Sequence, residues 1–301
     1  MFDFRKIQLD DREWINECLK ISDFRGCEYS FANNMAWQRL NDTQICREDG
    51  FYISCSQEEN QPFVTFPSGE KTDEKGREKY IKLFEKLKSH FENMGKTFVL
   101  SSVTDENLLW LKEYYGEKIS SKCYEESCDY IYNSTDLINF SGKKYHGKRN
   151  HLKHFYKNNW SFREFSPEYT DDCISFCTEI YNADKGYTNF SKVVEQYAIN
   201  LFFSFYKELD LKIGILFADE KIVGVSVGEQ LNSDTFDVHI EKADTDFQGS
   251  YPAICTNFAK NFAGNFRYIN REEDLGIEGL RKSKQSYHPE FLLRKNIVAF
   301  N

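Results

Sequence analysis

The apolar residues of this 301-residue chain change their spacing repeatedly, from the two-residue period of strands to the 3.6-residue period of helices. The clearest helix covers residues 73–94, where Tyr80, Phe84 and Leu87 fall on one face and Gly95 ends the pattern. Extended runs at 44–55 and 61–66 precede this helix, and a strand at 97–102 follows it. Such alternation predicts an α/β (α+β) protein with mixed sheets flanked by helices.

The second half follows a similar order of elements, although no sequence identity between the halves is visible. The patterns predict, in order, a strand at 160–165, helices at 168–182 and 189–209, strands at 211–218, 222–230 and 235–241, a helix at 252–262, a strand at 267–270, a helix at 276–286 and a closing strand at 292–300. We therefore expect two domains, 1–138 and 139–301, with a basic linking helix at 139–158 and the functional site in the second domain.

Composition excludes several classes of protein. Lys and Arg number 39 against 48 Asp and Glu, and this net charge of −9 argues against a surface that wraps nucleic acid. No apolar run approaches the roughly 18 residues of a membrane span, and no signal segment is visible. The nine cysteines contain no C-x-x-C pair. We expect a cytoplasmic protein with reduced thiols, no stable membrane insertion, no disulfide framework and no metal site.

One segment departs from the acidic average. No Asp or Glu occurs from Leu137 to Arg163, whereas Lys and Arg recur through it. Lys148 and Arg149 in this basic helix are candidates for contacts with the phosphates of a transfer-RNA end, a nucleotide or a lipid head. The alternative is a solvated linking helix in which Arg149 pairs with a carboxylate of the same protein.

The strand at 235–241 places ionisable groups at alternate positions. Asp237, His239 and Glu241 are expected on one face of it. Glu241 or His239 is a candidate general base, because an amine acceptor with a reference pKa of about 10.4 must lose a proton before it attacks. A buried polar ladder satisfied by Arg or Lys explains the pattern equally well.

Two further segments carry candidate ligand-binding residues. Gly249, Ser250 and Tyr251 lie between a strand and a helix, where free amides can hold an anion or acyl donor. The second segment follows a strand end, where α/β folds place ligands, and its candidates are Asn270, Arg271, Glu272, Asp274, Arg281 and Lys284. The alternatives are an ordinary strand–helix turn and charges that suit a helix dipole.

Two other motifs do not support a function. Residues 224–228 match G-x-S-x-G, but they alternate inside a strand and lack the strand-to-helix turn of a nucleophile elbow. His151 and His154 have no Cys or carboxylate ligands near them in the sequence, so they do not predict a metal site.

Residues 142–152 (GKKYHGKRNHL), 238–243 (VHIEKA) and 270–289, from Asn270 to Pro289, carry a family resemblance. They are similar to a bacterial family related to the C-terminal domain of phosphatidylglycerol lysyltransferase. The resemblance implies two tandem acyl-CoA N-acyltransferase-like domains over the whole chain. Tyr287 resembles the tyrosine with which many acyltransferases protonate the leaving group.

Our leading hypothesis is a transferase that moves an aminoacyl or acyl group from aminoacyl-tRNA or an acyl thioester such as acyl-CoA to a small amine or hydroxyl acceptor. These donors would be substrates, and the partners would be the acceptor and transfer RNA. The alternative is a non-catalytic protein that binds a phosphorylated or aminoacylated ligand in the same cleft, because a fold does not decide between the two.

Overall fold

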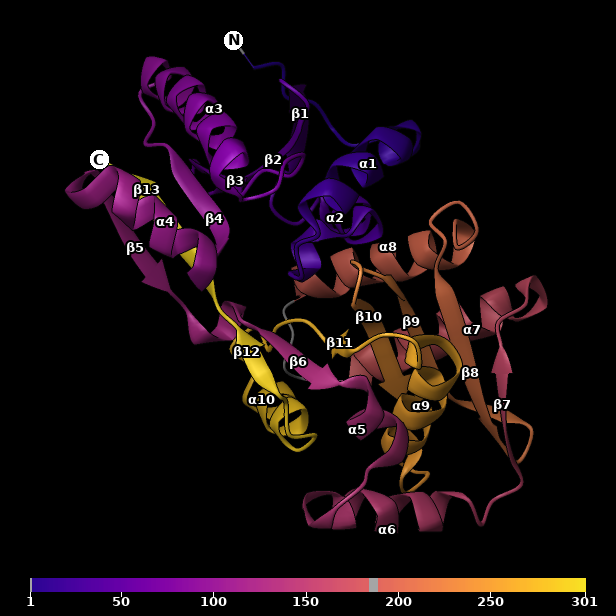
Figure 1. The fold of residues 1–301 in the computed structure, drawn as a ribbon. Helices are drawn as coiled ribbons and strands as arrows, with labels where there is room; N and C mark the ends of the chain where they lie inside the picture. The colour runs from indigo at the N-terminus through magenta and orange to yellow at the C-terminus, as the bar shows by residue number, and fades with distance from the viewer. Residues whose placement is uncertain (1, 184–188) are drawn as a thin grey trace. The chain divides into compact units, whose positions relative to one another are not determined.

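The computed structural model of the protein describes residues 2–183 and 189–301 (Figure 1). The chain divides into two compact units. Unit 1 contains the residues up to Asp129 together with Leu293–Asn301, and unit 2 contains Tyr130–Leu292. Among the described residues, no helix is long and apolar enough to cross a membrane.

Unit 1 contains a six-stranded sheet in the order β1-β2-β3-β4-β13-β5. The strands are β1 (Gln44–Glu48), β2 (Phe51–Glu58), β3 (Gln61–Thr65), β4 (Val99–Thr104), β5 (Ile119–Cys123) and β13 (Lys295–Phe300). Only β3 and β4 pair in parallel within this sheet. The helices are α1 (Arg12–Ser22), α2 (Phe31–Trp37), α3 (Glu74–Asn93) and α4 (Asp105–Tyr115).

Helix α3 forms for the reasons visible in its sequence. Asp73 caps it by accepting a hydrogen bond from the Gly76 amide at 3.0 Å. The predicted apolar face is buried, and it packs with strand residues such as Ile53 and Leu100 in the core of unit 1. Burial of this one face fixes α3 against the sheet.

Unit 2 contains a seven-stranded sheet in the order β12-β6-β11-β10-β9-β8-β7. The strands are β6 (Asp129–Asn133), β7 (Trp160–Glu164), β8 (Lys212–Ala218), β9 (Lys221–Gln230), β10 (Thr235–Ala243), β11 (Tyr268–Asn270) and β12 (Phe291–Leu293). The helices are α5 (Ser134–Asn139), α6 (His146–Phe155), α7 (Thr170–Ala183), α8 (Asn189–Ser204), α9 (Ser250–Phe258) and α10 (Glu278–Gln285). Helix α9 packs on one face of the sheet, and residues of α8 contact the other.

Strands β10 and β11 pair in parallel over only a short distance. Their ladder runs from Thr235 opposite Tyr268 to Asp237 opposite Asn270. Strand β10 then continues to Ala243, whereas β11 ends at Asn270. The main chain that follows β11 is therefore free to leave the sheet beside the second half of β10.

A β-bulge in β10 changes which side chains share a face. Val238 lies opposite Gly228 and Ile240 opposite Val227, so His239 is an extra residue in the strand. His239 stacks on Phe202 of α8, whereas Glu241 lies on the α9 face. The expectation that Asp237, His239 and Glu241 share one face is therefore wrong, because the bulge moves the residues after it to the opposite face.

The predicted closing strand at 292–300 is two strands with Arg294 between them. Strand β12 joins the sheet of unit 2, and β13 lies between β4 and β5 in the sheet of unit 1. Val298 and Phe300 of β13 are buried in the core of unit 1. The compact units consequently differ from the expected domains 1–138 and 139–301.

The first strands of unit 1 also differ from expectation. Near the start of the chain, Arg5 forms a single antiparallel bridge with Ile45. The extended run at 44–55 is two strands, because Asp49 and Gly50 adopt positive φ angles of 50° and 84° and turn the chain back.

Candidate functional site

Four of the predicted site residues meet on the α9 face of unit 2, beside the part of β10 that β11 leaves unpaired. We call Lys148, Glu241, Arg271 and Tyr287 the Arg271 cluster. At its centre, Nη2 of Arg271 donates a hydrogen bond to Oε1 of Glu241 at 2.7 Å. Only 11% of the Arg271 side chain and 7% of the Glu241 side chain are exposed. The pair is thus held largely out of water, where a charge needs a partner.

Arg271 lies against two aromatic rings. Its guanidinium carbon is 4.6 Å from the ring centroid of Tyr287 and 5.7 Å from that of Tyr132. Within the described part of the chain, the buried Nη1 atom of Arg271 has no hydrogen-bond partner. A buried guanidinium nitrogen without an acceptor can donate to an oxygen of a ligand.

Burial and charge act in opposite directions on the ion pair. Burial alone would lower the pKa of Arg271, but the neighbouring Glu241 carboxylate raises it above its ordinary value. Burial raises the pKa of Glu241, and Arg271 opposes that rise. The guanidinium therefore remains charged at every physiological pH.

Lys148 of α6 contributes the amine of the cluster. Its Nζ lies 3.4 Å from the ring centroid of Tyr287 and donates to the Ser286 hydroxyl at 2.8 Å. Burial and the nearby Arg271 charge lower the pKa of the Lys148 amine to about 8. A lowered pKa makes the neutral amine available nearer to neutral pH, so Lys148 can both accept and donate a proton.

Tyr287 supplies the surface on which both cations rest. It is 2% exposed, and burial raises the pKa of its hydroxyl well above the ordinary value. The Tyr287 carbonyl accepts a hydrogen bond from the Tyr145 hydroxyl at 2.8 Å. Tyr287 therefore stays protonated and remains a possible donor.

Two members of this environment were not among the residues expected from the sequence. Tyr132 of β6 lies under Arg271, and burial raises the pKa of the Cys255 thiol in α9 to about 12. Both residues occupy apolar positions of their elements, so their sequence pattern is that of ordinary core residues. Only the long-range pairing of β6 with β11 could have indicated that Tyr132 lies here.

His239 lies on the other face of the sheet in a separate polar cluster. Its Nδ1 is 3.0 Å from Glu272 and its Nε2 is 3.1 Å from Glu229. Asp237 lies 3.7 Å from Nδ1. Burial would lower the pKa of His239, but these three carboxylates raise it well above the ordinary value. The three carboxylates therefore favour the protonated form of the His239 ring.

Ligand atoms of Asp237, His239 and Glu272 lie within 4.8 Å of one another, a spacing that a metal ion could accept. A histidine binds a metal ion as a neutral imidazole, through a nitrogen with a free lone pair. In the arrangement described, each ring nitrogen of His239 lies within hydrogen-bond distance of a carboxylate. The geometry therefore favours an internal ion cluster.

The remaining candidates after β11 hold the loop in shape. Asn270 accepts a hydrogen bond from the Glu272 amide at 2.7 Å. Asp274 accepts from Arg281 at 2.6 and 3.0 Å. The buried Lys284 amine donates to the main-chain carbonyls of Arg271 and Glu273. This network positions Arg271, so we assign these residues to support of the site.

The structure also gives packing roles to Arg149 and to the turn at 249–251. Arg149 donates to the carbonyls of Phe140 and Gly142, each at 2.6 Å. Gly249 has a φ of 91°, and a Cβ atom there would lie 2.2 Å from the His151 carbonyl oxygen of α6.

The side chain of Ser250 is also engaged, since its hydroxyl donates to the Asp244 carbonyl at 2.6 Å. Tyr251 packs against the core cluster that contains Phe155 and Ile254. Helix α6 thus covers the start of α9, which was the expected anion site.

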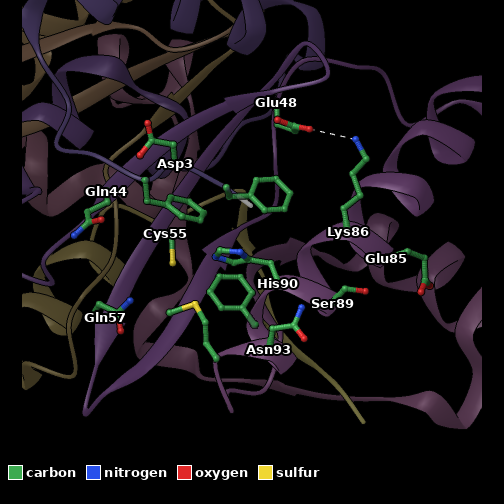
Figure 2. Close-up of a pocket in the computed structure, with 14 residues that line it drawn as sticks. Asp3, Gln44, Glu48, Cys55, Gln57, Glu85, Lys86, Ser89, His90 and Asn93 are labelled. Carbon is green, nitrogen blue, oxygen red and sulfur yellow. Dashed lines mark hydrogen bonds and ion pairs between the residues drawn. The ribbon is translucent and has the colours of Figure 1, made fainter.

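Unit 1 contains an open groove of about 1170 Å³ between its N-terminal segment, strands β1 and β2, and helix α3. Figure 2 shows the His90 ring within the groove and an ion pair between Glu48 and Lys86 at its rim. None of the predicted site residues lines this groove. Apolar and ionisable side chains line it together, among them Phe4, Asp3 and His90.

Comparisons with known proteins agree with the expected fold. A conserved protein of unknown function from Bacteroides thetaiotaomicron is 31% identical, with a TM-score of 0.91 and full coverage of both chains. The structure of L-PGS from Bacillus licheniformis has a TM-score of 0.65 at 15% identity, covering 98% of this chain and 92% of that one. A tandem GNAT protein from the clavulanic acid pathway has a TM-score of 0.51 at 7% identity, covering 100% and 99% of the two chains.

The expected tandem acyl-CoA N-acyltransferase-like fold is confirmed by these similarities. A family described as "Phosphatidylglycerol lysyltransferase, C-terminal" matches residues 19–299, nearly the whole chain. That description denotes the transfer of an aminoacyl group. The chain therefore belongs to the family of phosphatidylglycerol lysyltransferase C-terminal domains, and this membership associates it with aminoacyl transfer in general.

Proposed function

We propose that the Arg271 cluster catalyses the transfer of an aminoacyl or acyl group from an activated ester or thioester to an amine or hydroxyl. One observation carries the proposal: an amine with a pKa of about 8, Lys148, shares the Tyr287 ring with a guanidinium whose Nη1 atom lacks an acceptor among the described residues. The first group can handle a proton, and the second can stabilise a developing oxyanion.

The reaction needs little more than these groups, because the donor is already activated. The neutral Lys148 amine takes a proton from the attacking amine or hydroxyl. Nη1 of Arg271 donates a hydrogen bond to the carbonyl oxygen as it becomes an oxyanion. The tetrahedral intermediate then expels the donor's alcohol or thiol, which receives the proton from the Lys148 ammonium. Tyr287 can provide a second hydrogen bond to this leaving atom.

Glu241 has a different role in this scheme from the one expected from sequence. Its carboxylate accepts the hydrogen bond from Nη2 of Arg271, so in this scheme it is engaged with the guanidinium and does not take the substrate's proton. It holds the guanidinium in position and balances its charge. Lys148, expected to bind an anion, takes over the proton transfer.

Helix α6 favours aminoacyl-tRNA over a small thioester as the donor. Lys148 lies on the same helix as the exposed Lys153, within the acid-free segment. Such a surface suits a polyphosphate backbone. The start of α9, where an acyl-CoA pyrophosphate would be expected, is covered by α6 at Gly249.

A transfer assay with the full chain tests this proposal. Transfer RNA charged with a mixture of radiolabelled amino acids is incubated with the protein and an extract of small amines, and the label is followed into each fraction. Parallel reactions contain labelled acetyl-CoA as donor. We expect label to move from transfer RNA to an acceptor and Lys148→Ala to reduce the rate by about 10²-fold or more.

Lys153→Ala is the matched control, since it removes a charge from the same helix without touching the cluster. It should leave turnover unchanged and weaken only the salt-dependent binding of transfer RNA. If the protein binds charged transfer RNA but returns all the label unchanged, the alternative of a non-catalytic binding protein is correct. If label moves from acetyl-CoA but not from transfer RNA, aminoacyl-tRNA is not the donor.

A further inference from the structure

We propose that Cys123 and Cys128 are a site of reversible oxidation at which the two thiols form a disulfide with each other. Their sulfur atoms lie 3.8 Å apart. Cys123 is the last residue of β5, and Cys128 immediately precedes β6, so the intervening loop consists of Tyr124–Ser127. A short movement of two side chains at the ends of one loop brings the sulfurs to bonding distance.

The two thiols differ in exposure, and this difference sets which of them reacts first. Cys123 is half-exposed, whereas the other eight cysteines of the chain are buried. Burial raises the pKa of the Cys128 thiol to about 11, so Cys128 reacts poorly with a reagent in solution. Cys123 is therefore the thiol that an external oxidant meets first, and Cys128 is the thiol that resolves the product.

The co-reactant is a low-molecular-weight disulfide, a reagent of the glutathione class. The Cys123 thiolate attacks one of its sulfurs, forms a mixed disulfide and releases the first small thiol. The Cys128 thiol then loses its proton and attacks the Cys123 sulfur, which releases the second small thiol. Two protein thiols are oxidised and one small disulfide is reduced, so electrons and protons balance.

The site lies next to a buried ion pair of unit 1. Asp129, which follows Cys128, accepts a hydrogen bond from the Lys295 amine of β13 at 2.7 Å and one from the Cys27 amide at 2.9 Å. These bonds hold the main chain beside Cys128 in place. Only the Tyr124–Ser127 loop needs to adjust when the bond forms.

Cleavage after Lys122 and Lys143 leaves both cysteines on one peptide, so a single digest tests the proposal. Native full-length protein is treated with oxidised glutathione, remaining thiols are alkylated, and the digest is analysed by mass spectrometry. We expect this peptide to lose two hydrogens and to carry no alkyl group. A protease specific for Glu cuts at Glu125 and Glu126, between the cysteines, and the fragments should stay joined until a reductant is added.

Cys128→Ser should stop the reaction at a stable glutathione adduct on Cys123, and Cys123→Ser should abolish modification. Cys173 and Cys177, which are four residues apart but both buried on α7, provide an internal control that should remain reduced. The proposal is overturned if the wild-type protein stops at the Cys123 adduct, or if neither thiol reacts. These outcomes do not depend on whether the Arg271 cluster transfers an acyl group.

Discussion

Replacing Glu241 by Gln should strongly destabilise unit 2, because it leaves the buried Arg271 charge without its anion. Both side chains are about nine-tenths buried, and Nη2 and Oε1 are 2.7 Å apart. Breaking such a pair costs about 3–5 kcal/mol, and Gln keeps one acceptor, so we expect a loss of about 3 kcal/mol. For a domain of this size that corresponds to a fall in Tm of about 6–12 °C.

Differential scanning calorimetry of the full chain measures this effect. Lys282→Gln is the matched control, since its ion pair with Glu278 is 73% and 79% exposed and should contribute almost nothing. The double variant Glu241→Met/Arg271→Met removes both charges and should recover most of the lost stability. If Glu241→Gln changes Tm no more than the control does, the pair is well hydrated and our description of the cluster is incorrect.

Three further predictions concern packing and protonation. Gly249→Ala should lower the free energy of unfolding by more than about 2 kcal/mol in urea titrations, because φ is 91° and the new methyl group meets the His151 carbonyl oxygen. Gly147→Ala is the control, since an added Cβ there has no neighbour within 4 Å and should not destabilise the protein. The rate of transfer should rise as pH increases through about 8, where the Lys148 amine becomes neutral, and a flat profile would exclude Lys148 as the base. His239→Gln should destabilise most at pH 6 or below, where the imidazolium contribution is complete, and progressively less as pH rises through the raised folded-state pKa. Urea midpoints at pH 6 and pH 9 test this, and an equal loss at both values would contradict it.

Local patterns predicted most of the elements correctly. The apolar face of α3 and its Asp73 cap depend on residues that are close together in the sequence, so short-range rules account for them. The strand at 292–300 could not be divided in the same way. Whether Lys295–Phe300 joins one sheet or another depends on partners almost 200 residues earlier, and both sheets accept an apolar strand.

The candidate site was predicted in composition but not in arrangement. Lys148, Glu241, Arg271 and Tyr287 were all among the expected residues. The acid-free segment indicated Lys148, and the alternation of its strand indicated Glu241. The strand end indicated Arg271, and the family resemblance indicated Tyr287. Their roles depended on a bulge at His239, which sends Glu241 and His239 to opposite faces. A bulge adds one residue to a ladder, and nothing in the alternation of β10 signals it.

The place of β13 has a consequence for how the protein is made. Ribosomes deliver a chain from its N-terminus, and domains generally fold as they emerge. Tyr130–Leu292 contains every residue of unit 2, so that unit can fold as soon as it has left the ribosome. The earlier-synthesised residues up to Asp129 must wait for Lys295–Phe300 to fill the gap between β4 and β5. The half that is translated first is therefore completed last, and until then it exposes two unpaired strand edges to the chaperones of the cell.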